Sequence, residues 1–241
     1  MSEREQHTYD YPKADITTDA VIFGIDPNNG ELMVLLIRRG REGEPFFGDW
    51  ALPGGFLEMD ESIEDCVRRE VNEECGIELS FIEQLYTYGH PSRDPRGRVI
   101  SVAWMALTRP DQLQVKAGDD AAEAAWFDVL RALDLNSPRL AFDHQQILAD
   151  ALQRLRSKIA WQPVGLQLMP EEFTLTELQE VYETVLNGSL DTRNFRRRLL
   201  AYGVLVLTDK LRKTGGKPAQ LYRFDEGLYK QLRQRGMDFT I

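Results

Sequence analysis

Cysteines are scarce in this sequence, and it has no long apolar run. Its two cysteines, Cys66 and Cys75, lie nine residues apart on one predicted helix. At 1.5 Å per residue this is about 13 Å, too far for a disulfide. No apolar run approaches the roughly eighteen residues that span a membrane, and MSEREQHTYDYPKAD at the start lacks the apolar stretch of a secretory signal. These features exclude a disulfide-stapled secreted scaffold, and we expect a cytoplasmic protein.

Basic residues are also scarce, but only in the first part of the chain. Residues 1–160 carry 17 Lys and Arg against 29 Asp and Glu, whereas residues 161–241 carry 12 against 10. Within 191–224, nine basic residues are opposed only by Asp191 and Asp209. Such a run is usually a solvated surface, but in a chain of net charge −10 it favours a polyanionic partner.

The first 160 residues predict an α/β unit with a mixed sheet flanked by helices. The segment 144–160 has the apolar spacing of an amphipathic helix. Short runs rich in β-branched and aromatic residues predict the strands. These runs are 17–25, 31–39, 79–90, 98–109 and 124–129.

The remaining residues predict a winged helix-turn-helix. TLTELQEVYETVLNG (174–188) opens with a capping box and ends in glycine, and DTRNFRRRLLAYG (191–203) reads as a second helix before a basic hairpin. WQPVGLQLMPEE (161–172) has no clear period and is expected to be a connection accessible to proteases. We therefore predict two domains, 1–160 with its core at 14–150, and 161–241.

The stretch 54–77 predicts a strongly acidic helix. It holds eight acidic side chains, and Glu70, Glu73 and Glu74 fall at i, i+3 and i+4 on one face. Like charges so placed cost about 0.2–0.5 kcal/mol per pair, so a positive group is expected between them. A divalent cation with oxygen ligands, Mg²⁺ first, fits this position. The alternative is a solvated acidic helix whose own arginines balance the charge.

The same stretch contains signals for both ends of the helix. Apolar residues repeat every four positions from Ile63 to Val71, which predicts a buried face. Asp60 or Ser62 is placed to cap the first turn, and Gly76 is placed where a left-handed residue ends a helix.

The spacing of the stretch decides between the alternatives, because it fits G-x5-E-x7-R-E-U-x-E-E-x-G-U at every specified position, where U is a bulky aliphatic residue. This is the Nudix box, and residues 14–150 resemble a Nudix domain. The resemblance implies a Nudix α/β/α sandwich that hydrolyses a nucleoside diphosphate linked to another moiety. It also implies that Glu70, Glu73, Glu74 and the Gly54 carbonyl hold Mg²⁺, or Mn²⁺ in its place, and that Arg69 and Glu61 brace the helix. The matching positions are Gly55, Glu61, Arg69, Glu70, Val71, Glu73, Glu74, Gly76 and Ile77.

In this family the catalytic base can lie outside the box, and Asp119, Asp120 and Glu123 are the candidates, with ordinary surface acids as the alternative. We expect Trp50 to pack beneath its loop rather than flank a base. We expect His144 to be a cap or a surface residue, with a polar residue of the site as the alternative.

Arginines near the box are candidates for contacts with a phosphate, with solvent exposure as the alternative for each. Two of them end a predicted strand, and three lie in the loop HPSRDPRGR (90–98). The candidates are Arg38, Arg39, Arg93, Arg96 and Arg98.

Beyond the box, the chain resembles the Nudix-related transcriptional regulators of NAD metabolism, in RGRVISVAW, LAFDH, FTLTELQEVYE, NFRRRLL and GGKPAQLYRF. The resemblance implies a homodimer that binds operator DNA and releases it when ADP-ribose or a related metabolite binds. Several such regulators carry a degraded box, whereas this box is intact, so we expect retained hydrolysis. The alternative is a plain hydrolase of the ADP-ribose pyrophosphatase type whose second domain serves dimerisation or RNA contact.

The helix at 191–203 is the expected recognition helix. Phe195, Leu199 and Leu200 are predicted to face the domain core, which leaves its basic N-terminal half for DNA. The alternative is that these arginines pair with acids of the first domain. The expected DNA contacts are Thr192, Arg193, Arg196 and Arg197, with Lys213 and Lys217 from the hairpin tip.

Overall fold

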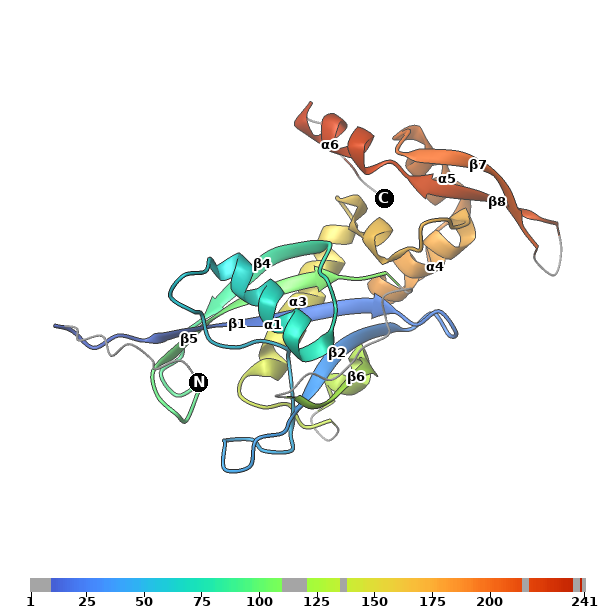
Figure 1. The fold of residues 1–241 in the computed structure, drawn as a ribbon. Coiled ribbons are helices and arrows are strands. Elements are labelled where there is room, and N and C mark those ends of the chain that lie inside the picture. The colour runs from blue at the N-terminus through green and yellow to red at the C-terminus, as the bar shows by residue number, and fades with distance from the viewer. Residues whose placement is uncertain (1–9, 110–120, 135–137, 214–216, 236–238, 240–241) are drawn as a thin grey trace.

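The N-terminal unit is built on a six-stranded mixed sheet (Figure 1). The computed structural model describes residues 10–109, 121–134, 138–213, 217–235 and 239. The strand order is β3-β2-β1-β5-β4, and β6 also pairs with β2. β1 and β5 run parallel, and the other strand pairs described in this sheet are antiparallel. The strands are β1 (Asp15–Ile25), β2 (Leu32–Arg39), β3 (Trp50–Ala51), β4 (Phe81–Tyr88), β5 (Val99–Leu107) and β6 (Ala121–Asp128).

Helices cover both faces of this sheet. α1 (Ile63–Cys75) packs its apolar side, including Val67, on one face, while α3 (His144–Ile159) packs Ile147 on the other (Figure 1). β1 is buried from Thr17 to its end because it lies between these layers. The predicted α/β/α sandwich is therefore confirmed. A short helix, α2 (Val129–Ala132), follows β6.

The C-terminal unit is the predicted winged helix. A capping box starts α4, because the Thr174 side chain accepts from the Glu177 N–H at 3.1 Å and Glu177 accepts from the Thr174 N–H at 2.8 Å. The Phe195 ring of α5 packs edge-on against Tyr182 of α4 at 5.2 Å between ring centroids. The hairpin extends away from the Nudix sheet (Figure 1). The elements are α4 (Leu175–Leu186), α5 (Thr192–Ala201), β7 (Leu205–Arg212), β8 (Ala219–Phe224) and α6 (Glu226–Gln234).

Two local expectations in this unit are wrong. α4 ends at Leu186, and the left-handed residue is Asn187, with φ 53°, rather than Gly188. Leu200 is 45% exposed, whereas Phe195 and Leu199 are buried. At i+5 from Phe195, Leu200 is rotated about 140° around the helix, so it cannot share the buried face.

The expectation that 161–172 is a connection accessible to proteases is also wrong. The segment after α3 forms a 3₁₀ helix, η2 (Pro163–Leu168), in which Val164, Leu166 and Leu168 are buried. These residues belong to one apolar cluster that includes Ile147 of α3 and Tyr182 of α4. The connection is therefore a core element between the two units.

Gly165 allows this close packing. A Cβ at Gly165 would lie 2.6 Å from the Tyr182 ring and 3.0 Å from the Ile159 side chain. Because real Cβ atoms do not approach so closely, the position requires glycine.

Cys66 and Cys75 are buried free thiols, as the sequence predicts. Among the helices that the structure describes, none is long and apolar enough to cross a membrane.

Candidate functional site

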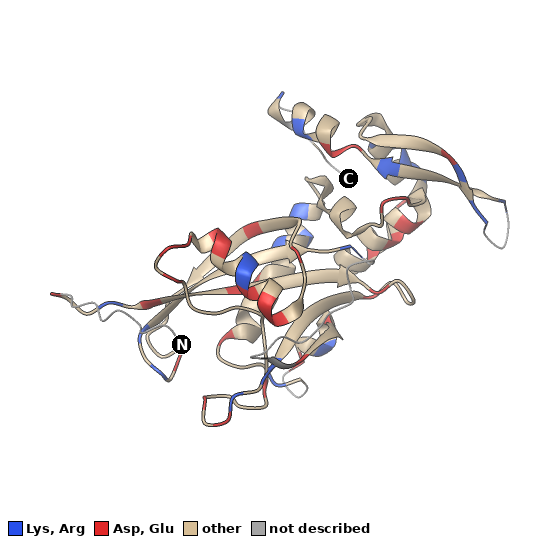
Figure 2. Ribbon diagram, in the orientation of Figure 1, with Lys and Arg blue, Asp and Glu red and all other residues tan. Residues whose placement is uncertain are grey.

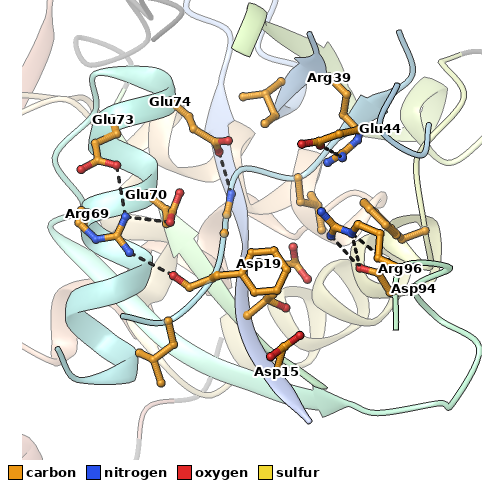
Figure 3. Close-up of a pocket in the computed structure, with 18 of the residues that line it drawn as sticks. Asp15, Asp19, Arg39, Glu44, Arg69, Glu70, Glu73, Glu74, Asp94 and Arg96 are labelled. Atoms are coloured by element: carbon orange, nitrogen blue, oxygen red, sulfur yellow. Dashed lines mark hydrogen bonds and ion pairs between the residues drawn. The ribbon is translucent and has the colours of Figure 1, made fainter. Parts of the chain in front are cut away.

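A pocket of about 1140 Å³ opens beside the Nudix box (Figure 3). α1 forms one wall, and Arg39 and Arg96 lie on the opposite side. Asp19 of β1 lies between the two walls. Nine carboxylates and five arginines line the pocket, so it is acidic before any ligand enters.

α1 is positioned by caps at both ends. The Ser62 hydroxyl accepts from the Asp65 N–H at 3.1 Å, so Ser62 rather than Asp60 is the N-cap. Gly76 takes the left-handed conformation, with φ 68°, and its N–H donates to the Asn72 carbonyl at 2.8 Å. These caps fix the helix register and thereby the face that carries the box carboxylates.

Arg69 lies at the centre of the box. Its guanidinium donates to both Glu61 carboxylate oxygens, at 2.9 and 2.7 Å, and to Glu70 at 2.8 Å and Glu73 at 3.2 Å. The hydrogen bonds from Arg69 hold the pKa of Glu61 at about 2. Those bonds in turn raise the pKa of Arg69. Arg69 of the same helix is therefore the positive group that lies among the glutamates in this structure.

The Gly54–Gly55 loop fits tightly between β1 and α1. The Gly54 N–H donates to Glu74 at 2.8 Å. A Cβ at Gly54, whose φ is 153°, would lie 2.0 Å from the Thr18 carbonyl oxygen, and one at Gly55 would lie 2.4 Å from the Glu70 carboxylate. Both glycines are thus required for the loop to reach the box carboxylates.

The donor set at this site fits a hard divalent cation. Carboxylates and a backbone carbonyl are the ligands that Mg²⁺ prefers, and burial raises the pKa of Glu70, which a bound cation would oppose. Among the described residues no three such side chains converge, because Arg69 holds Glu70 and Glu73 while the Gly54 N–H holds Glu74. The chemistry of the donors fits, and the carboxylates must reorient to share one ion.

Three of the five candidate arginines line the pocket, and two of them, Arg39 and Arg96, lie against the same aromatic ring. The Arg39 guanidinium lies 4.9 Å from the Phe142 ring centroid, and the Arg96 guanidinium lies 5.5 Å from the same centroid. Arg39 also donates to Glu44 and Arg96 donates to Asp94. Burial and the charge of Arg96 both lower the pKa of Arg39. An anion placed between the two guanidiniums would relieve this repulsion.

Phe142 holds an unfavourable backbone conformation. Its φ is 53°, in the left-handed region that residues other than glycine rarely adopt. Such strain persists only where the surroundings enforce it, and it is found often at functional sites. The Phe142 ring also packs against Phe46 at 4.7 Å and His144 at 5.2 Å between centroids.

Arg38, Arg98 and Glu123 lie apart from the pocket lining. Arg38 is half exposed and pairs with Glu123 of β6 at 3.8 Å, and Arg98 donates to the Gly89 carbonyl at 2.6 Å. This placement gives no support to Glu123 as the base. Asp119 and Asp120 lie outside the described residues. Trp50 packs edge-on against Phe127 at 4.6 Å, as expected.

Sequence reasoning missed a buried polar network on the pocket floor. Arg93, expected at a phosphate, donates instead to both Asp143 oxygens at 3.0 and 2.7 Å and to Asp19 at 3.3 Å. Ser101 also donates to Asp19. Burial alone would raise the pKa of Asp19, but His144, Arg93 and Ser101 hold it at about 2.

His144 belongs to this network and is 3% exposed, so the expectation of a cap or surface residue is wrong. Its Nδ1 accepts from the Leu52 N–H at 2.9 Å, and its Nε2 lies 3.4 Å from Asp19. Because both ring nitrogens are engaged, His144 positions the floor of the pocket and has no free nitrogen to act as a base.

The candidate DNA-contacting side chains differ in exposure. Arg193 and Arg197 are exposed on α5, whereas Arg196 is half-buried and donates to the Thr176 hydroxyl at 2.9 Å. Thr192 accepts from Gln179 at 3.1 Å, which ties α5 to α4. Figure 2 shows Lys and Arg along the β7–β8 hairpin. Lys213 and Lys217 are exposed there, on either side of the hairpin tip.

Known proteins resemble this chain over both units. A model of the NUDIX domain matches residues 16–151, and one of the NrtR DNA-binding winged helix domain matches residues 165–224. The ADPR responsive transcriptional repressor NtrR of Acinetobacter baylyi is 39% identical over 219 residues, which are 89% of this chain and 84% of that protein. The ADP-ribose pyrophosphatase of Methanocaldococcus jannaschii is 44% identical over 120 residues, 50% of this chain and 66% of that protein.

A solved structure extends this likeness to the whole fold. The crystal structure of Shewanella oneidensis NrtR complexed with a 27mer DNA matches with a TM-score of 0.79 and 36% identity, over 89% of this chain and 95% of that chain. The protein is therefore a member of the Nudix family. Within it, the chain belongs to the NrtR family, because it joins a Nudix domain to an NrtR winged helix.

Proposed function

We propose that this protein is a transcriptional repressor that binds operator DNA through its winged helix and responds to ADP-ribose, or a closely related nucleotide, in the Nudix pocket. The observation that carries the proposal is that one chain joins a complete Nudix box to an NrtR winged helix, and that the sheet face opposite the box shares one apolar cluster with the winged helix. The names of the A. baylyi and S. oneidensis relatives support the same ligand and the same kind of partner.

The pocket suits a ligand that has both a diphosphate and a polar sugar. Arg39 and Arg96 offer paired guanidiniums to phosphate oxygens. The nine lining carboxylates would repel a diphosphate unless a cation balanced them. We therefore propose that the ligand enters together with Mg²⁺, which Glu70, Glu73, Glu74 and the Gly54 carbonyl would hold.

We further propose that the pocket retains hydrolysis. A bound Mg²⁺ supplies charge neutralisation at the phosphate oxygens and lowers the pKa of an attacking water. Arg69 and the Gly54 N–H keep the box carboxylates together at one side of the pocket, from which they would turn onto the cation. The box, intact at every specified position, and the relative named as an ADP-ribose pyrophosphatase support this activity.

With millimolar Mg²⁺, we expect release of AMP and ribose 5-phosphate from ADP-ribose, and a rate about a hundredfold lower for Glu74→Gln. The glutamine oxygen can still accept from the Gly54 N–H, so the substitution removes charge while the loop stays in place. Chromatographic assay of AMP measures the effect. Glu64→Gln is the matched control, because Glu64 lies on the same helix and pairs with Arg68 away from the pocket lining. Equal rates for the two variants would contradict the assignment.

Duplex DNA from upstream of the protein's own gene should bind in a mobility-shift assay, and ADP-ribose should release it. We expect binding as a homodimer, because helix-turn-helix dimers read two half-sites. Arg193→Ala should weaken specific binding by about 1–3 kcal/mol if the side chain contacts a base, and Lys213→Ala should weaken binding to all sequences and flatten its salt dependence. Weak, salt-insensitive binding unchanged by either substitution would instead leave a Nudix hydrolase with an accessory domain.

A further inference from the structure

α3 begins at the pocket. Phe142, Asp143 and His144 precede or open the helix, and each contacts the pocket wall or floor. Phe142 lies against Arg39 and Arg96, Asp143 accepts from Arg93, and His144 faces Asp19. A ligand that binds Arg39, Arg93 or Arg96 therefore changes the contacts that hold the first turn of α3.

The body of α3 is a rigid connection through the core. It has sixteen residues and is about 24 Å long at 1.5 Å per residue. Ile147, Leu148, Ala151 and Leu155 have no exposed surface, so the helix is packed along its whole inner side. Close packing of this kind transmits a displacement of one end instead of absorbing it.

The last turns of α3 hold the DNA-binding unit. Arg156 donates through Nε to the Val185 carbonyl at 2.9 Å, one of the carbonyls at the C-terminal end of α4 that lack a partner within the helix. The positive charge of Arg156 at this end also interacts favourably with the helix dipole of α4. Nearby, Ile159 of α3 and Tyr182 of α4 close around Gly165 of the connection.

α4 in turn positions α5. Gln179 of α4 donates to the Leu190 carbonyl at 3.2 Å and to the Thr192 hydroxyl at 3.1 Å, where α5 starts. Tyr182 packs against Phe195 of α5. Any tilt of α4 is therefore passed to the helix that carries the candidate DNA contacts.

We propose that α3 is the coupling element of this protein, with Phe142–His144 sensing the pocket and Arg156 passing the displacement to α4. This inference rests on the proposed function, namely that the pocket binds ADP-ribose and the winged helix binds DNA. Ligand and DNA then favour two different positions of α3. Each weakens the binding of the other by the same factor, because coupling between sites is reciprocal. Arg156 touches neither ligand in this scheme and acts as a positioning residue.

The test measures two affinities separately for wild type and for Arg156→Ala. ADP-ribose binding is followed by calorimetry, and DNA binding by fluorescence anisotropy with and without saturating ADP-ribose, on a duplex that the wild type binds. We expect Arg156→Ala to bind ADP-ribose with its affinity unchanged within about twofold. We expect the ADP-ribose-induced change in DNA affinity to fall by about fivefold or more.

Arg154→Ala is the matched control, because Arg154 lies one half-turn away on α3 and contacts Glu83 and the Leu85 carbonyl within the Nudix unit. It should retain the wild-type response to ADP-ribose. If Arg156→Ala keeps the full response, or if Arg154→Ala loses as much of it, the coupling role of Arg156 is overturned. A wild-type protein whose DNA binding ignores ADP-ribose would instead overturn the proposed function itself.

Hydrogen exchange on the wild type tests the same idea without a substitution. Saturating ADP-ribose should change the exchange of backbone amides at 183–190, the end of α4 and the turn into α5, although these residues lie outside the pocket lining. Unchanged exchange at 183–190, together with protection of the pocket loop at 52–60, would overturn the coupling proposal while leaving ligand binding intact.

Discussion

Replacing Arg93 by methionine should lower the free energy of unfolding by about 3–5 kcal/mol, the usual cost of leaving a buried charge without its partner. The Arg93 side chain is 4% exposed and pairs with Asp19 and Asp143. Methionine fills much of the volume but removes the guanidinium from Asp19, itself 7% exposed, which keeps only His144 and Ser101 as partners. Urea denaturation at pH 7 measures the loss.

Acid titration gives a second readout of the same substitution. In the wild type the pKa of Asp19 is lowered from 3.8 to about 2, because His144, Arg93 and Ser101 together outweigh burial. A carboxyl whose pKa is lower in the folded state than in the unfolded state stabilises the fold at pH values above its unfolded-state pKa. This contribution, about 2 kcal/mol, is therefore lost as pH falls from about 4 to about 2. In Arg93→Met the Asp19 pKa should rise, so stability is lost at higher pH.

Arg98→Met is the control for this prediction. Arg98 belongs to the same loop but is exposed and donates to a backbone carbonyl. Its replacement should change stability by no more than about 0.5 kcal/mol. Similar losses for Arg93→Met and Arg98→Met would mean that the buried network contributes little.

Gly54→Ala should destabilise the protein by about 3 kcal/mol, at the upper end of the usual cost of overpacking, and should abolish ADP-ribose binding. The new Cβ would lie 2.0 Å from the Thr18 carbonyl oxygen, and backbone of the central strand cannot move aside as a flexible side chain can. Displacement of the loop also breaks the hydrogen bond from the Gly54 N–H to Glu74. Thermal unfolding and calorimetric titration with ADP-ribose measure the two effects.

Gly97→Ala provides the comparison, because a Cβ at Gly97 meets no atom within 4 Å. That variant should keep wild-type stability within about 0.5 kcal/mol and bind ADP-ribose normally. A Gly54→Ala protein with wild-type stability and binding would contradict this prediction, because it would show that the loop can move away from β1 at little cost.

The sequence predicted those features whose determinants lie close together along the chain. The α1 caps, the box spacing and the Thr174–Glu177 capping box each depend on residues within a few turns of one helix. The strand runs were equally local, because β-branched and aromatic residues mark a pleated, buried surface. For this reason the mixed sheet flanked by helices and the winged helix could both be predicted from residue patterns, while the α/β/α sandwich followed from the resemblance to Nudix domains.

The buried network could not be predicted in this way. Asp19 and His144 are 125 positions apart, and their meeting depends on the parallel pairing of β1 with β5 and on where α3 starts. A weak signal existed, since Asp19 directly precedes the apolar run 20–25 of the same predicted strand, and a charge in a central strand needs a partner. The burial of 163–168 was also hidden, because a 3₁₀ segment has no apolar period of its own.

The position of Gly165, enclosed by Ile159 and Tyr182, has a consequence for how such proteins can be recombined. Hybrids that join the Nudix half of one relative to the winged helix of another should fail when cut at the connection, since each half would lose the surface that covers its apolar side. A hybrid in which residues 144–186 all come from one parent keeps Ile159, Gly165 and Tyr182 together. By the same reasoning, a substitution accepted at any one of them during divergence should restrict which residues the other two can accept.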